Sequence, residues 1–69
     1  MVEVFKTNVQ QNEHAAELIN VLHQAFPGNK INFDLDDCDK VLRIEGHSFI
    51  CSNIIRVLQE RGFYCNILE

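Results

Sequence analysis

Apolar and polar residues alternate along residues 30–36, 40–45 and 63–68, and residues 2–7 are rich in β-branched and aromatic side chains. Both patterns are typical of strands, and a period of two indicates a strand that buries one face and exposes the other. The sequence therefore predicts four strands. The positions expected to share the inner faces are Ile31, Phe33, Leu35, Leu42, Ile44, Phe63, Cys65 and Ile67.

Two longer segments, 13–26 and 49–61, repeat their apolar residues every three or four positions, which predicts amphipathic helices. Asn12 and Ser48 precede them, and either side chain can accept hydrogen bonds from the free amides of a first helical turn. Gly62 suits the left-handed position that follows a helix. The expected apolar stripes are Ala15, Leu18, Ile19, Leu22, Ala25 and Phe26 in the first helix and Ile50, Ile54, Val57 and Leu58 in the second.

The predicted order of elements is β-α-β-β-α-β, in one domain over residues 1–69. With right-handed crossovers this order gives a ferredoxin-like α+β sandwich, in which a four-stranded antiparallel sheet carries two helices on one face. The topology also predicts that the loops at 8–12, 36–39 and 61–62 lie at the same end of the molecule. A site built from loops would draw on this set.

The chain carries 10 acidic and 6 basic residues, for a net charge of −4. Phosphate binding needs clustered Lys or Arg, and here the basic residues are scattered, so we expect no nucleic-acid partner. No apolar run approaches the roughly 20 residues that span a bilayer, and the N-terminus does not resemble a signal peptide. We therefore expect no membrane partner and a cytoplasmic location. One small core uses most of the apolar residues, and no catalytic constellation is evident, so we expect no enzyme.

Three cysteines, Cys38, Cys51 and Cys65, lie 13 and 14 residues apart. An odd number without a C-x-x-C pair argues against a disulfide framework and against a zinc site built from cysteines alone. We expect reduced thiols, with Cys51 and Cys65 acting as small core residues.

The whole chain resembles the heavy-metal-associated domain, the family of small copper chaperones and of the N-terminal modules of metal-transporting ATPases. The acidic hairpin over residues 34–41 and the sequence Gly62-Phe63-Tyr64 before the last strand are similar to features of that family. The resemblance implies the ferredoxin-like fold. ACT domains share the element order but usually differ in loop glycines and length.

The family's motif is M-x-C-x-x-C after the first strand, where two thiolates bind Cu(I) or a similar soft ion. Alignment on the helix that follows places Val9 at the Met, Gln11 at the first Cys and His14 at the second. Both thiols of the motif are therefore replaced. The resemblance implies the fold, and it transfers no cysteine ligand to this chain.

His14 is the first candidate metal ligand that remains. Together with Glu13, Cys38 or a second subunit it would bind a borderline transition-metal ion such as Zn²⁺, Cu²⁺ or Ni²⁺; alternatively it is a solvated histidine of the first helical turn. Cys38 lies among the four aspartates of residues 34–39. These acids would attract a cation, or they would form the wet face of a strand and protect the hairpin from edge pairing.

Two functions are consistent with the sequence. The first is a small soluble non-enzymatic binding module, an adaptor or regulatory partner that binds a protein or a second copy through the sheet face or edge. Tyr64 and Val41, beside Val2 or Val4, are expected on the sheet face that the helices leave open. The alternative is a metal-ion carrier or sensor with altered ligands centred on His14.

Overall fold

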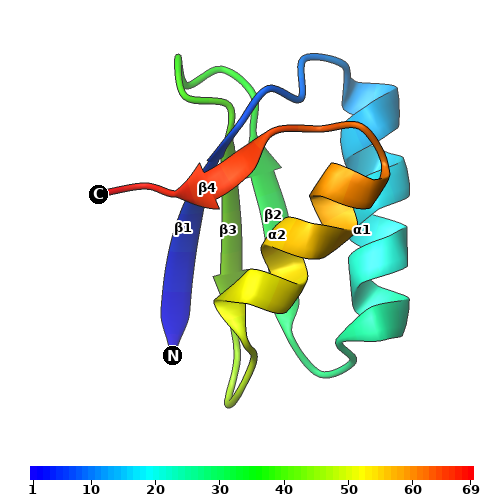
Figure 1. Ribbon diagram of the computed structural model, residues 1–69, viewed down its shortest axis with the longest axis vertical. Helices are drawn as coiled ribbons and strands as arrows, with labels where there is room; N and C mark the ends of the chain where they lie inside the picture. Colours follow the sequence, from blue (N-terminus) through cyan, green and yellow to red (C-terminus); the bar gives the residue numbers. More distant parts are fainter.

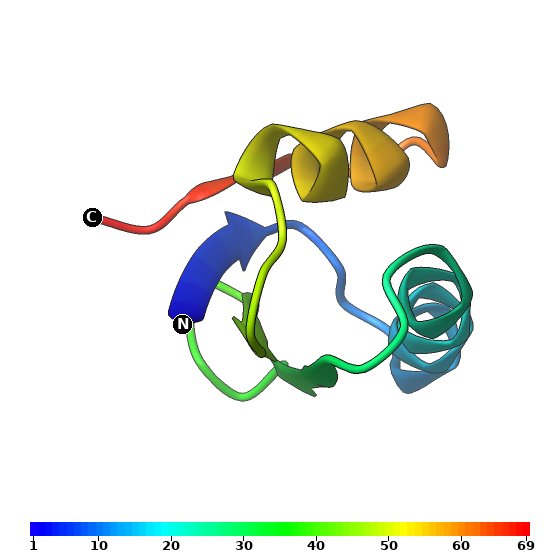
Figure 2. The same ribbon diagram turned by 90° about the horizontal axis from the view of Figure 1, so that it is seen from below.

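The computed structural model describes residues 1–69 and has six elements in the predicted order (Figure 1). They are β1 (Val2–Thr7), α1 (Asn12–Ala25), β2 (Lys30–Asp34), β3 (Val41–Glu45), α2 (Cys51–Glu60) and β4 (Cys65–Ile67). The strands form one antiparallel sheet in the order β2-β3-β1-β4, and both helices pack on one face of it (Figure 2). This arrangement confirms the predicted ferredoxin-like α+β fold. Neither helix is both long enough and apolar enough to cross a membrane.

The register of the strands explains where the core lies. Phe5 of β1 pairs with Leu42 of β3, and Ile31 of β2 pairs with Ile44 of β3. Directly opposed residues of antiparallel strands point to the same face, so these side chains form one apolar layer beneath the helices. The buried core comprises Phe5, Val9, Ala15, Leu18, Leu22, Ile31, Leu42, Ile44, Phe49, Ile54, Leu58 and Cys65.

The end of α2 confirms the role predicted for Gly62. Its φ of +89° lies in the left-handed region, which glycine enters at low cost. The amide of Gly62 donates to the carbonyl of Gln59 at 3.0 Å, and the amide of Phe63 donates to the carbonyl of Leu58 at 2.9 Å. This pair of bonds is the Schellman motif, which satisfies the last carbonyls of the helix and turns the chain toward β4.

The starts of both helices differ from the prediction. Gln11 occupies the capping position of α1 and Ile50 that of α2, and neither makes a side-chain capping hydrogen bond. Asn12 is the first residue of α1 instead of its cap. Ser48 lies two residues before the capping position of α2, too early in the chain to serve it.

Three residues predicted to face the core are exposed: Ile50, Ala25 and Ile67. Ile50 is 61% exposed because its backbone is extended (φ −107°, ψ 117°), so the buried neighbour Phe49 takes the inward position. Ala25 is the last residue of α1. Ile67 is 40% exposed because it ends β4, a short strand at the border of the sheet.

Candidate functional site

Three loops meet at one end of the sheet, as the topology predicts (Figure 1). They are the β1–α1 loop, the tip of the β2–β3 hairpin and the α2–β4 loop. The amide of Thr7 donates to the carbonyl of Asp39 at 3.0 Å, which joins β1 to the hairpin tip. The amide of Tyr64 donates to Oδ1 of Asn8 at 2.8 Å, which joins the α2–β4 loop to the β1–α1 loop. We call this region the loop end.

Thr7 is the polar residue that is buried at the loop end, with 5% of its surface exposed. Its hydroxyl donates to the carbonyl of Lys40 and accepts from the amide of Val9 at 3.2 Å. Val9 is fully buried, and it occupies the position that the resemblance assigns to the motif's Met. The carbonyl of Lys40 and the amide of Val9 therefore already have hydrogen-bond partners within the chain.

His14 is half-buried in the first turn of α1. Its ring lies against that of Phe63, with centroids 5.4 Å apart and planes inclined at 59°. A tilted arrangement of this kind is a favourable aromatic contact, so His14 helps to join α1 to the α2–β4 loop. Glu13 and Gln11 beside it are exposed. None of these side chains belongs to a group of three potential metal ligands.

Cys38 lies exposed at the hairpin tip, in a group with Asp37 and Asp39 whose ligand atoms are all within 4.8 Å of one another. The carboxylates also have structural roles. Oδ1 of Asp37 accepts from the amide of Asp39 at 2.9 Å, and the Asp39 carboxylate lies 3.8 Å from Nζ of Lys6. The structure thus groups Cys38 with the neighbouring acids of its own turn instead of with His14.

Cys51 is the first residue of α2, Cys65 lies in β4 within the core, and all three cysteines are free. Burial, and secondarily the thiol of Cys51, raises the pKa of Cys65 to about 12. Burial, followed by the carboxylate of Glu3, raises the pKa of Cys51. Soft metals bind the thiolate, so a thiol that keeps its proton at neutral pH is a poor ligand. Cys65 is buried in the core and Cys51 packs against it, as the sequence predicts.

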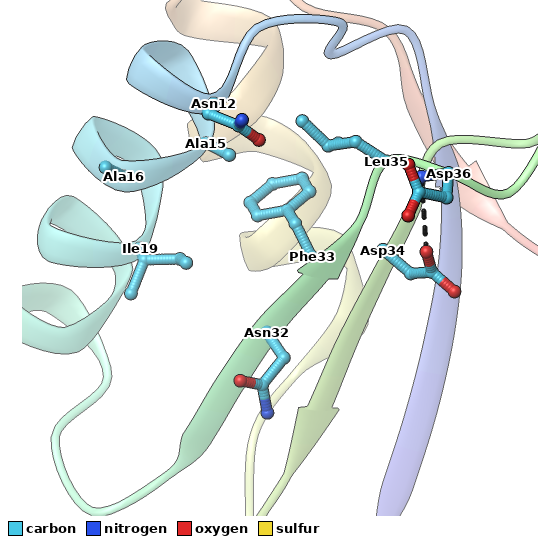
Figure 3. A pocket seen from close by; sticks show the side chains of 9 residues that line it. All are labelled: Asn12, Ala15, Ala16, Ile19, Asn32, Phe33, Asp34, Leu35 and Asp36. Atoms are coloured by element: carbon cyan, nitrogen blue, oxygen red, sulfur yellow. Dashed lines mark hydrogen bonds between the residues drawn. The ribbon is translucent and has the colours of Figure 1, made fainter.

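A second region is the border of the sheet at β2 with the groove beside it. The sequence predicts binding through the sheet face or edge without naming a strand, and it does not predict the groove. β2 pairs with β3 on one side only, so its other side is an edge of the sheet. A groove of about 460 Å³ runs between this edge strand and α1 (Figure 3). Its lining residues are Asn12, Ala15, Ala16, Ile19, Asn32, Phe33, Asp34, Leu35 and Asp36.

The side chains of the groove divide by character. Figure 3 shows Phe33 and Leu35 on the strand side facing Ala15, Ala16 and Ile19 on the helix, which gives an apolar floor. Aspartates 34 and 36 lie at one end. The small residues on α1 leave the space open, and the pair of alanines was the signal in the sequence that could have suggested it.

Comparisons of the chain with protein-family models, with curated proteins and with solved structures give no match. The loop end and the β2 edge are therefore the two regions from which a function can be inferred.

Proposed function

We propose that this chain is a non-enzymatic protein-binding module of the heavy-metal-associated type, an adaptor or regulatory partner that uses the β2 edge. The observation that carries the proposal is the combination of an unpaired edge strand with a groove directly beside it, which has apolar side chains on its floor and asparagines and aspartates around them. Many recognition domains bind an extended segment in this way. The added backbone pairs with the edge strand, and alternate side chains enter the neighbouring pocket.

The edge of β2 lacks most of the features by which proteins protect a sheet border. All five of its residues pair in continuous register with β3, so it has no bulge, and it contains no proline. Its charged side chains are Lys30 at the first position and Asp34 at the last. Edge strands are commonly blunted by prolines, bulges or several inward charges, so the long regular edge of β2 favours pairing with another strand.

The open face of the sheet is a weaker candidate for the binding surface. Val2 and Tyr64 are 46% and 49% exposed, as expected for a contact surface. Val2 begins β1, however, whereas Tyr64 lies beside Asn8 beyond the other end of that strand. The exposed Lys6, which forms an ion pair with Asp39, lies between them on β1. Two separated apolar side chains do not form a continuous patch, so the edge with its unpaired backbone groups is the preferred location.

Site-specific photo-crosslinking in the source cells tests this proposal. A photoreactive phenylalanine analogue at Asn32, in the middle of β2, is expected to give one adduct of discrete mass with a bound protein. The same analogue at Arg56, which is exposed on α2 away from the groove, is the matched control and is expected to give none. Equal adducts from both positions, or no adduct from Asn32, would contradict binding at this edge.

A metal-ion carrier remains the second candidate, and the grouping of Cys38 with Asp37 and Asp39 favours it. Titration of the reduced protein with Cu(I), Zn²⁺ and Ni²⁺, followed by NMR, separates the two functions. A carrier that uses the hairpin tip predicts saturable shifts of the Cys38 resonances with one equivalent of metal, which Cys38→Ser abolishes. A carrier centred on His14 predicts such shifts for His14 as well, which His14→Ala abolishes. The adaptor predicts no saturable shift below millimolar metal.

A further inference from the structure

We infer that β2 pairs with β2 of a second copy of this chain, antiparallel and centred on Asn32, to join two four-stranded sheets into one. This inference rests on the proposed function, because it names the occupant of the edge that the proposed function leaves general. A two-fold axis through Asn32 makes the contact isologous, so each copy contributes the same residues.

The sequence of β2, Lys-Ile-Asn-Phe-Asp, is self-complementary when read against itself in reverse. In the register centred on Asn32, Lys30 lies opposite the second copy's Asp34, and Ile31 lies opposite the second copy's Phe33. Asn32 lies opposite its own equivalent. Opposite charges and apolar pairs that face each other directly across antiparallel strands are favourable, and here every position of the strand has such a match or an amide pair.

The centred register also matches the two faces of the strands, so that helix-side residues lie opposite helix-side residues. Ile31 is buried on the helix side and Phe33 is half-buried there, whereas Lys30, Asn32 and Asp34 are exposed on the other side. The centred register keeps each residue opposite one from the same face. Both α1 helices then lie on the same side of the joined sheet, and the second copy's Ile31 covers the outer side of Phe33.

Lys30 and Asp34 have charges that the single chain leaves unpaired. The two ion pairs of the structure join Lys6 to Asp39 and Arg43 to Glu45, and neither includes an edge residue. Within the sheet Lys30 lies opposite Glu45, which is already paired with Arg43. Asp34 lies opposite the apolar Val41. A second copy supplies a partner for both charges, twice in each dimer.

Other registers fit less well. A shift by one residue places buried positions opposite exposed ones and turns the helices to opposite sides. A register centred on Phe33 needs residues 35 and 36, which lie beyond the end of β2. One centred on Ile31 places Phe33 opposite the second copy's Asn29, which precedes the strand. The centred register is therefore the one that uses the whole strand.

Reversal of the charge at Lys30 or at Asp34, each in a separate variant, tests the inference. Two five-residue strands bury less area than a standard interface, so sedimentation equilibrium of the reduced protein is measured from about 10 µM to about 1 mM. Lys30→Glu or Asp34→Lys alone is expected to raise the dimer dissociation constant about tenfold or more, because like charges then face each other twice. An equimolar mixture of the two variants is expected to restore the dimer, because every charge pair is again opposite in sign.

Arg56→Glu is the matched control, since it makes the same change in charge on the exposed side of α2, away from the edge. It is expected to leave the dissociation constant within about twofold of the original value. A chain that is monomeric at about 1 mM overturns the inference. So does a mixture that fails to recover the dimer, or a dimer weakened equally by Arg56→Glu and Lys30→Glu.

Disulfide trapping tests the register. In a chain with Cys38→Ser, the variant Asn32→Cys is expected to form a crosslinked dimer on mild oxidation, and Arg56→Cys, on the exposed side of α2, is not. Crosslinking at Phe33→Cys in place of Asn32→Cys overturns the centred register. The proposed function and the self-pairing can fail separately. If Asn32 forms a photo-adduct with a different protein and the chain is monomeric, the adaptor is supported and self-pairing is overturned. If Asn32 forms no adduct with any protein, both are contradicted.

Discussion

The loop end and the β2 edge differ in whether their backbone N–H and C=O groups have hydrogen-bond partners within the chain. At the loop end, Thr7, Val9 and Lys40 satisfy one another, and Asn8 accepts from the amide of Tyr64. Along β2 the backbone groups on the outer side have no partner within the sheet, because β2 pairs with β3 alone. The end of the molecule at which the resemblance places an ion is thus closed by the chain itself, and the border of the sheet is left open.

This difference indicates where a partner can form backbone hydrogen bonds at the lowest cost in free energy. A partner that pairs with the backbone at the loop end has to displace internal hydrogen bonds, and leaving a buried group unsatisfied costs about 1–3 kcal/mol. A strand that arrives at β2 displaces only water and adds backbone hydrogen bonds. Backbone pairing at the edge therefore needs less rearrangement than backbone pairing at the loop end, which favours the edge as the docking site for a strand.

The largest effect is expected from opening the loop end. Thr7→Val keeps the shape of the side chain but removes the hydroxyl that bonds both Lys40 and Val9. The free energy of unfolding in urea is expected to fall by about 2–3 kcal/mol, because a buried amide and a partly buried carbonyl lose their partner. Thr7→Ser keeps the hydroxyl and is expected to cost only about 1 kcal/mol for the lost methyl group. Equal losses in the two variants would show that the hydrogen bonds do not close this end.

A second effect, of about 2 kcal/mol, comes from the thiol below α2. Cys65 has a pKa of about 12 in the folded chain, and an unfolded cysteine has a pKa of about 8.5. The folded state therefore keeps a proton that the unfolded state loses, so the stability is full below about pH 8.5 and declines as the pH rises toward 12.

The measurement is the free energy of unfolding of the original chain and of Cys65→Ala at several pH values. The free energy of unfolding of the original chain minus that of Cys65→Ala is expected to fall by about 2 kcal/mol between about pH 8 and about pH 10. Other groups that titrate in this range do so in both chains, so they cancel in the difference. A constant difference across the range would contradict a thiol held protonated in the core.

The periods in the sequence predicted five of the six elements, because burial on one side of a strand or helix determines the pattern. The β-branched and aromatic residues of segment 2–7 predicted β1. The ends of elements were less accurate. Residues 35 and 36 continue the alternation of β2, yet the strand stops at Asp34, whose Oδ1 accepts from the amide of Asp36 at 3.2 Å. A local side-chain bond to the backbone ended the strand, and competition of this kind does not appear in a hydrophobic pattern.

The geometry of the candidate sites was harder to predict from the sequence, because it depends on contacts between distant parts of the chain. The ring of His14 meets that of Phe63, from the loop after α2, and no local pattern reports such a contact. The edge position of β2 follows from the sheet order. The groove, in contrast, depends on how far α1 stands from β2, which the sequence indicated only through the small side chains of Ala15 and Ala16.

The smallest effect separates the two regions most directly, because it makes the same substitution in each. Asn8→Ala removes the acceptor of the Tyr64 amide at the loop end and is expected to lower the free energy of unfolding by about 1 kcal/mol. Asn32→Ala, on the exposed side of β2, is expected to change it by less than about 0.5 kcal/mol in the monomer. Urea unfolding at low protein concentration measures both values. An equal cost at the two positions would mean that the edge is as tightly held as the loop end, whereas the expected inequality means that Asn32 is available for a partner strand.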